Sequence, residues 1–396
     1  MDDVAIKTIS DLLLSVNEAE DPLDLVLKSC LGSIKRLLES VMEAERDVFC
    51  GIGSRGRGML RQDQRNGYYE RDLETVFGIL AKLRVPRTRS GSFRSKLIEQ
   101  HQRRQRKLTE FIRSLFLNGV SQRDVSEVLG PILGIEPSHT TVSRIAKSLD
   151  KEVRRFHSRT LSDDYKYLLL DGIALRVKVA PYAVGRCALV AMGVREDGSK
   201  EILSFRVEHS ESQACWERFL SDLYNRGLIG QGLKLIVSDG GPGLLAALGV
   251  AYPYTPHQRC WVHKMRNVAA KLKKAQKKPC LDGLKSVYQS QNKHEAERMY
   301  RAWESTWKSE ALDAVECVRT DLEDLLVFLD FPEHDRHIIS TTNHLERCFR
   351  EFRRRLRTIG CMKNTASCNR MLYALSNRLN RRWQRKSVKI AFTQAA

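Results

Sequence analysis

The sequence predicts a mixed α/β core that contains an all-helical insertion and follows a mainly helical N-terminal region. Two apolar runs that each end in an acid, Tyr167–Asp171 and Leu235–Asp239, indicate strands of the core. The stretch from Lys264 to about Asp335 is polar, helical in pattern and without a strand signal. We therefore expect five segments: a helical region with a basic hairpin or loop (1–93), a helix-turn-helix-like domain (94–160), the first part of the core (161–263), the insertion (264–335), and the C-terminal helix of the core with a basic tail (336–396).

The charge balance predicts a polyanionic partner. The chain has 396 residues and a formal net charge of +19 at pH 7, which favours nucleic acid. No apolar run approaches the roughly 20 residues of a membrane-spanning helix, so we expect no membrane partner. The acidic start, Met1-Asp2-Asp3, lacks a signal-peptide pattern, and the ten cysteines include no CxxC pair. These features are typical of a reduced, intracellular protein.

The first segment is expected to hold one long helix and a hairpin. Asp21 and Pro22 resemble an N-cap followed by proline at the first helical position. The helix is indicated by apolar residues at spacings of 4, 3, 4 and 3, namely Leu27, Leu31, Ile34, Leu38 and Val41. Glycine and arginine between Gly51 and Gly58 predict a basic loop, and the strand formers from Tyr68 to Val85 predict a hairpin.

Two helices in the second segment fit a helix-turn-helix. Ser121 and Asp124 are placed to cap the first, and the second begins near Pro137. The second helix would enter a major groove with its N-terminal residues. The candidate DNA contacts there are Ser138, His139, Thr141 and Arg144, with Arg87 and Arg89 in the basic loop before the domain. The alternative is a helical hairpin that packs internally.

The core segment reads as three strands, a helix, a strand, a helix and a strand. The expected strands are Tyr167–Asp171, Ala174–Val179, Cys187–Val194, Lys234–Asp239 and His257–His263. The expected helices are Ser210–Leu228 and a short one that begins at Gly241-Pro242-Gly243. This order is typical of an α/β sheet of the ribonuclease-H-like type.

The C-terminal helix combines an acid, an apolar face and a basic stripe. Leu345, Phe349, Phe352 and Leu356 form the apolar face. Glu346, Arg350, Arg353 and Arg357 repeat on an adjacent face, so the helix would present a carboxylate that leads into arginines. Together with Arg354, these arginines are candidate DNA contacts.

Three acids are the candidate metal ligands: Asp171, Asp239 and Glu346. Two strands and one helix can direct three carboxylates at one point, and oxygen ligands suit Mg²⁺. Each acid has an ordinary alternative. The two aspartates precede glycines and so favour turns, and Glu346 lies three residues after Asn343, as in a capping box. Cys260 and His263 supply only two of the four ligands of structural zinc, so we expect them beside the site instead.

Four motifs resemble the Mutator-like family of DDE transposases, which includes many bacterial insertion-sequence transposases. The resemblance covers residues 60 to 385. Its motifs are Leu170-Asp171-Gly172, Val237-Ser238-Asp239-Gly240-Gly241-Pro242-Gly243-Leu244, the run from Gln258 to Asn267 with Cys260 and His263, and Thr342-Asn343-His344-Leu345-Glu346-Arg347 with Arg353-Arg354-Arg355. Residues 343–349 are bulkier than the small residues often found near the family glutamate, which bears on local packing.

The resemblance implies a DNA transposase whose acidic triad is Asp171, Asp239 and Glu346. Such an enzyme would bind terminal inverted repeats, cleave the ends by metal-dependent hydrolysis and join the 3′ ends to target DNA. It would use two Mg²⁺ ions, for which Mn²⁺ can substitute, and act as a homodimer on double-stranded DNA. A bacterial, cytoplasmic, nucleoid-associated protein is expected. The rivals are a DNA-binding regulator and a nuclease of the same fold that does not join ends.

Overall fold

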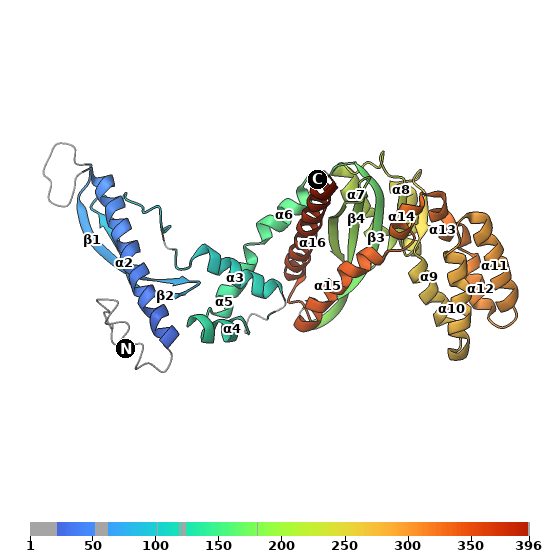
Figure 1. The fold of residues 1–396 in the computed structure, drawn as a ribbon, viewed down its shortest axis with the longest axis horizontal. Helices are drawn as coiled ribbons and strands as arrows, with labels where there is room; N and C mark the ends of the chain where they lie inside the picture. The colour runs from blue at the N-terminus through green and yellow to red at the C-terminus, as the bar shows by residue number, and fades with distance from the viewer. Residues whose placement is uncertain are drawn as a thin grey trace. The chain divides into compact units, whose positions relative to one another are not determined.

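The chain forms two compact units, Met1–Ala146 and Lys147–Ala396, which are described separately here. The computed structural model describes residues 22–51, 62–100, 102–118, 120, 124–179 and 181–394 (Figure 1). The predicted caps Asp21 and Ser121 lie outside the described residues, as does most of the predicted basic loop between Gly51 and Gly58.

The first unit contains a long helix on a hairpin and a group of three short helices. Helix α2 (Pro22–Cys50) packs on strand β2 (Gly78–Thr88), which pairs antiparallel with β1 (Arg65–Thr75). The predicted hairpin is thus confirmed. The three short helices are α3 (Arg106–Leu117), α4 (Asp124–Leu133) and α5 (His139–Lys147). They share a separate small core around Leu108, Ile112 and Val142.

The second unit is built on a five-stranded sheet in the order β5-β4-β3-β6-β7. Its strands are β3 (Tyr165–Val179), β4 (Tyr182–Arg195), β5 (Lys200–Glu208), β6 (Leu235–Ser238) and β7 (His257–Arg259). Strand β4 is antiparallel to both of its neighbours, β3 and β5, whereas β6 and β7 run parallel to β3. The helices between strands are α7 (Gln213–Asn225) and α8 (Pro242–Ala251), and α6 (Asp150–Ser158) precedes the sheet.

Three strand predictions are wrong in their boundaries. The two strands expected on either side of Gly172 are one strand, because Gly172 stays extended and pairs with Leu189 on β4. Asp171 therefore lies within β3 and does not end it. Strand β5 was not predicted, and the strand expected over His257–His263 stops at Arg259, where the chain turns into a helix.

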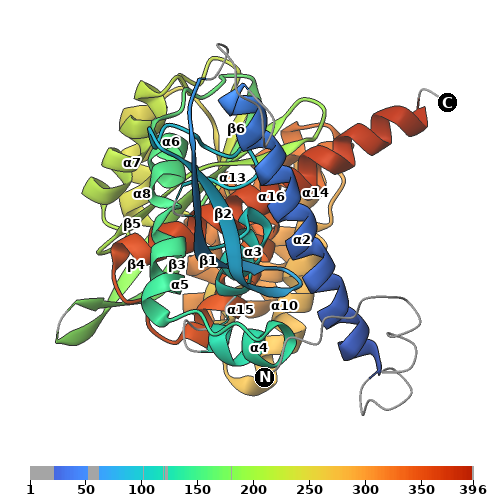
Figure 2. The ribbon, with the colours of Figure 1, turned by 90° about the vertical axis from the view of Figure 1, so that its left-hand side faces the viewer.

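The two faces of the sheet have different coverings. Leu168, Leu170 and Ile236 face a core that is shared with α7 and α8, which lie together on one side of the sheet (Figure 2). The other face includes Tyr167, whose hydroxyl donates a 2.8 Å hydrogen bond to Asp335. Since side chains alternate along a strand, Asp171 belongs to this second face.

The described chain between β7 and the last two helices is helical and contains no strand. It comprises α9 (Trp261–Ala270), α10 (Lys274–Tyr288), α11 (Lys293–Trp307), α12 (Leu312–Arg319), α13 (Leu322–Leu326), the 3₁₀ turn η1 (Val327–Asp330) and α14 (Glu333–Ile339). Helices α15 (Asn343–Ile359) and α16 (Thr365–Gln394) follow. Within the described ranges, no helix has the length and apolar character needed to cross a membrane.

Helix α16 closes one edge of the sheet. The side-chain amide of Asn380 accepts a 2.8 Å hydrogen bond from the backbone N–H of Ile202 on β5. The same amide donates a 3.0 Å hydrogen bond to the backbone carbonyl of Ile202. Arg370 also binds Asp150 of α6 through two bonds of 2.6 and 3.0 Å. The edge strand is therefore covered by a helix from the end of the chain.

Candidate active site

The two aspartates lie beside the same pair of parallel strands. Leu169 of β3 is in register with Val237 of β6; Asp171 lies two residues further along β3, and Asp239 directly follows Ser238, the last residue of β6. The charge of Asp239 acts on Asp171, which indicates that the two carboxylates are near each other. The sequence alone could not show this register.

Asp171 is a buried acid with a raised pKa. Its side chain is buried, and Oδ1 accepts a 2.8 Å hydrogen bond from the Gly172 N–H. Burial raises the pKa of Asp171 to about 7; the charges of Asp239 and Glu211 act in the same direction, while His263 opposes them.

Asp239 begins the tight turn between β6 and α8. Its Oδ1 accepts a 3.0 Å hydrogen bond from the Gly241 N–H. Gly240 has φ of 73°, and a Cβ there would come within 2.8 Å of the Arg259 guanidinium. The Asp-Gly pair therefore has the turn role that the sequence allowed, and the turn leaves the half-buried carboxylate beside Asp171.

Glu346 lies in the first turn of α15 and is held by two cations of α9. Arg266 donates to its two carboxylate oxygens at 2.5 and 3.0 Å, and His263 Nε2 lies 3.4 Å from Oε1. Burial alone would raise the pKa of Glu346, but the bonds from Arg266 outweigh it and the pKa is lowered. The helix is preceded by Thr342 without a side-chain cap, so the carboxylate serves this contact and not a capping box.

His263 contacts one of the three acids and is influenced by the charges of the other two. It occupies the first turn of α9, a helix that begins directly after Cys260. Its hydrogen bond with Cys260 raises the pKa of His263 to about 9, and the negative charges of Asp171 and Asp239 add to this. His263 also forms an ion pair with Glu346, so the charges of all three predicted carboxylates act on this one imidazole. Cys260 in turn accepts hydrogen bonds from the N–H and hydroxyl of Thr342 at 3.2 and 3.3 Å, which ties α9 to the start of α15.

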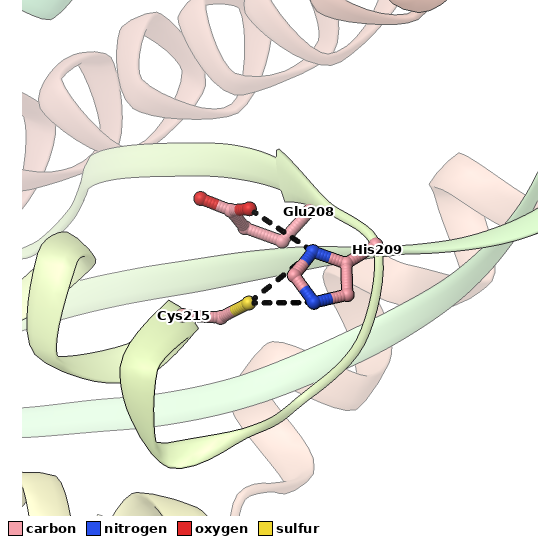
Figure 3. A group of neighbouring side chains, drawn as sticks. All are labelled: Glu208, His209 and Cys215. Carbon is pink, nitrogen blue, oxygen red and sulfur yellow. Dashed lines mark hydrogen bonds and ion pairs between the residues drawn. The ribbon is translucent and has the colours of Figure 1, made fainter.

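The oxygens of the three acids do not meet at one point in the observed arrangement. Within the part of the chain that the structure describes, the one group of three potential ligands within 4.8 Å of one another is Glu208, His209 and Cys215 (Figure 3). This group is already neutralised. Arg206 and Arg218 bind the two oxygens of Glu208 at 2.9 and 3.1 Å, and Arg218 donates to the sulfur of Cys215 at 3.4 Å. The guanidinium of Arg218 thus already binds Glu208 and Cys215, two of the three groups that a metal ion would need as ligands.

The predicted DNA contacts are exposed, with one exception. On α15, the apolar face of Leu345, Phe349 and Phe352 is buried as predicted. The exposed arginines are Arg350, Arg353, Arg354 and Arg357 on α15, and Arg87 and Arg89 at the end of the hairpin.

At the N-terminal end of α5, Ser138, His139 and Arg144 are also exposed. Thr141 is buried, and the Ser138 hydroxyl donates to its oxygen at 3.1 Å. Its side chain is therefore turned away from any groove that α5 would enter.

Arg266 is the site residue that sequence reasoning missed. It lies three residues after His263, and on a helix this spacing puts both side chains on one face. That spacing was the available signal. Its partner Glu346 was out of reach of such reasoning, because the helices α10 to α14 separate the two residues along the chain.

The fold and the site define an enzyme that acts on a polyanion, with buried acids next to an arginine-lined helix. Residues 8–386 match the family model described as "Transposase, Mutator family", and the chain belongs to this family. It is therefore a DNA transposase of the DDE type, a class of enzyme that depends on a divalent metal.

The relatives agree with this membership. The chain is 34% identical over 375 residues to the transposase for insertion sequence element ISRM5 of Rhizobium meliloti (strain 1021), covering 92% of this chain and 93% of that one. It is 30% identical to the transposase for IS256 in transposon Tn4001 of Staphylococcus aureus, covering 91% of each. Among solved structures, the HTLV-2 integrase catalytic core domain in complex with magnesium aligns at 16% identity over 28% of this chain and 74% of that one, with a TM-score of 0.16.

Proposed function

We propose that this transposase binds terminal inverted repeats, hydrolyses the DNA at the transposon ends and joins the freed 3′ ends to target DNA at one site. The observation that carries this proposal is that His263 forms an ion pair with Glu346 and is also influenced by the charges of Asp171 on β3 and of Asp239 directly after β6. The strand order, with three antiparallel strands followed by two parallel ones, supports a ribonuclease-H-like core.

The donor set fits a divalent metal. Asp171 is buried, and burial together with the charges of Asp239 and Glu211 raises its pKa. A bound cation would oppose both effects. Carboxylate oxygens are the ligands that Mg²⁺ prefers. Asp171 and Asp239 would hold the metal, and Glu346 would join them after its carboxylate leaves Arg266. When bound, two Mg²⁺ ions, or Mn²⁺ in their place, would activate the attacking water and stabilise the leaving 3′ oxygen.

The other residues would position the DNA. The water oxygen would form a bond to phosphorus as the bond to the 3′ oxygen breaks. The freed 3′ oxygen would then bond to a target phosphorus as the bond from that phosphorus to the target's own 3′ oxygen breaks, so no bond to the protein is needed. Arg350, Arg353, Arg354 and Arg357 would bind phosphates along α15. The first unit would read the repeats through Ser138, His139 and Arg144, with Arg87 and Arg89 on phosphates, and a homodimer would bridge two ends.

The test is an incubation of labelled terminal DNA with the protein and Mg²⁺. Cut and joined products are expected; cut products alone would mean a nuclease, and a mobility shift alone would mean a DNA-binding regulator. Asp239→Asn should lower cutting and joining by at least about a hundredfold, the order found when one electrostatic group is removed from an active site. The same variant should shift the DNA normally, because phosphate contacts dominate affinity. Normal joining by Asp239→Asn would refute its assignment.

A further inference from the structure

Two side chains of β7 hold the turn that carries Asp239. The pairing of β7 with β6 sets Arg259 beside Ser238, the residue before Asp239. The guanidinium of Arg259 packs directly on Gly240, where an added Cβ would come within 2.8 Å of it. The N–H of Gly240 donates a 3.1 Å hydrogen bond to the Ser238 hydroxyl, whose oxygen lies 2.8 Å from Nε2 of His257. The residues on both sides of Asp239 are therefore in contact with β7.

Each of these two β7 side chains meets an acid of the helical insertion. Helix α13 begins directly after Asp321, and Asp324 lies in its first turn. Oδ1 of Asp321 is 2.8 Å from a guanidinium nitrogen of Arg259, and Oδ2 of Asp324 is 3.7 Å from Nδ1 of His257. Arg259 and His257 are two residues apart on β7, so they share the face that α13 approaches. Two series of contacts thus run from the start of α13 to the turn of Asp239.

Other contacts already attach α13 to the sheet. The side chains of Trp261 and Gln258 donate hydrogen bonds of 2.7 and 3.1 Å to the carbonyl of Leu325, and Gln258 accepts a 2.6 Å bond from the N–H of Phe328. Leu325 and Phe328 are also buried. An exposed ion pair adds little to such an attachment, and the side chain of Asp324 is 44% exposed. A role for Asp324 is therefore to be sought in the turn that its partner contacts.

Asp321 connects the turn of Asp239 with helix α9 as well. Its second carboxylate oxygen binds the ammonium group of Lys264, a side chain that is almost completely buried. Lys264 directly follows His263 on α9. One carboxylate of the insertion therefore fixes Arg259 on the side of Asp239 and α9 on the side of His263. A buried cation and a half-buried guanidinium that share one acid depend strongly on that acid.

These contacts give the helical insertion a role in orienting a metal ligand. Residues that orient a ligand from outside the metal site typically contribute 10–100-fold to metal affinity or activity. We propose that Asp321 and Asp324 are positioning residues, which hold Asp239 at the metal site through Arg259 and His257. The inference rests on the proposed function, because it takes Asp239 as a metal ligand, and it adds that the insertion sets the direction of this carboxylate.

The test measures the binding of Mn²⁺ to DNA-free, full-length protein by calorimetry. Asp324→Asn should weaken this binding about tenfold, the lower end of the range for such outer residues. Asp321→Asn should weaken it at least as strongly, because Asp321 holds both β7 and α9. Asp330→Asn is the matched control, because Asp330 belongs to the same insertion, is 53% exposed and pairs with Lys293, away from β7. It should bind Mn²⁺ as the wild type does.

A second measurement separates positioning from a contribution to stability alone. In the labelled-DNA assay, Asp324→Asn should need about tenfold more Mg²⁺ for half-maximal cutting and should approach the wild-type rate when Mg²⁺ is saturating. Its DNA mobility shift and its unfolding temperature without metal should match those of Asp330→Asn. Asp324→Glu keeps a carboxylate near His257, so it should restore the wild-type Mn²⁺ affinity.

The decision rests on Asp324→Asn, because Asp321 is largely buried and its variant is the one that is liable to misfold. An unchanged Mn²⁺ affinity in Asp324→Asn would overturn the inference and leave the proposed function standing. A lower unfolding temperature with the Mn²⁺ affinity unchanged would do the same, since the acids would then only stabilise the fold. Failure of the proposed function would differ, because Asp239→Asn itself would then bind Mn²⁺ and cut DNA as the wild type does.

Discussion

Arg266 and a metal would compete for the same carboxylate. The guanidinium of Arg266 donates hydrogen bonds to both carboxylate oxygens of Glu346, although the side chain of Arg266 is 58% exposed to solvent. Arg266→Gln should free Glu346 and strengthen Mn²⁺ binding to DNA-free protein severalfold, as measured by calorimetry. Arg301→Gln is the control, since Arg301 is 79% exposed and its partner Glu297 is 3.9 Å away. An unchanged Mn²⁺ affinity would show that Arg266 does not restrain Glu346.

His157 should make the second unit sensitive to acid. Burial, followed by the charge of Arg226, lowers the pKa of His157 to about 4, whereas an unfolded chain has a histidine pKa near 6.5. Between these values the unfolded state binds more protons, so stability is complete above about pH 6.5 and falls as the pH drops towards 4.

His157→Phe should reduce this loss, because the ring packs 4.7 Å from Phe205 and an apolar ring can take its place. Thermal unfolding at pH 7.5 and pH 5 gives the comparison. The exposed His294→Phe serves as the control and should retain the full acid sensitivity. Equal acid sensitivity in wild type and His157→Phe would contradict the assignment.

At the scale of residues, the sequence identified acids by their neighbours but could not show how they are neutralised. Asp171 was selected as the end of a strand, and the structure places it inside β3. Its environment depends on Asp239, Glu211 and His263, which reach it from other elements. Burial and charge at one atom are sums over the folded chain, so no local pattern contains them.

At the scale of elements, the order of strands and helices in the core was predicted more accurately than their limits. The predicted order of helix, strand, helix and strand after the first strands matches the observed one, whereas the three strands predicted before it correspond to only two, β3 and β4. The error lay at Gly172, which was read as a break although it stays paired in β3. β5 was missed, and its Lys-Glu start and Arg-Val-Glu end leave a short apolar centre that gives a weak strand signal.

The arginines of α15 should act additively on DNA. Each exposed arginine that binds a phosphate releases counterions, so Arg353→Gln and Arg357→Gln should each reduce the slope of log affinity against log salt by about one. Fluorescence anisotropy with labelled terminal DNA measures the slope. Arg301→Gln on α11 should leave it unchanged, and an unchanged slope in the α15 variants would exclude them from the DNA path.

The contact between α16 and β5 should contribute measurably to stability. Asn380→Ala would leave the N–H and carbonyl of Ile202 without these partners, at a cost of about 1–3 kcal/mol. Urea unfolding gives the free energy. Asn377→Ala is the control on the same helix, since Asn377 makes only a 3.5 Å contact with Tyr373. Equal stabilities of the two variants would contradict the proposed role of Asn380.

At the scale of the whole molecule, a divalent cation should stabilise the fold. The cation would relieve the repulsion between Asp171 and Asp239, and it binds only the folded chain. Mg²⁺ at pH 8 should therefore raise the thermal unfolding temperature of wild type. Asp239→Asn should be more stable than wild type without Mg²⁺ and should lose the response to it. A Mg²⁺ response that persists in Asp239→Asn would place the cation elsewhere.

Asp171 and Glu346 are separated along the chain by the helices α9 to α14, and this separation determines when each acid is synthesised. A ribosome makes the DNA-reading helices first, then the sheet with its two aspartates, and the glutamate only near the end. On the proposed roles, a growing chain is harmless to the genome until synthesis is almost finished. An mRNA truncated within the region that encodes α9 to α14 would yield a protein that lacks Glu346. On the proposed roles, this protein would bind transposon ends without cutting them and would compete with the full-length protein for those ends.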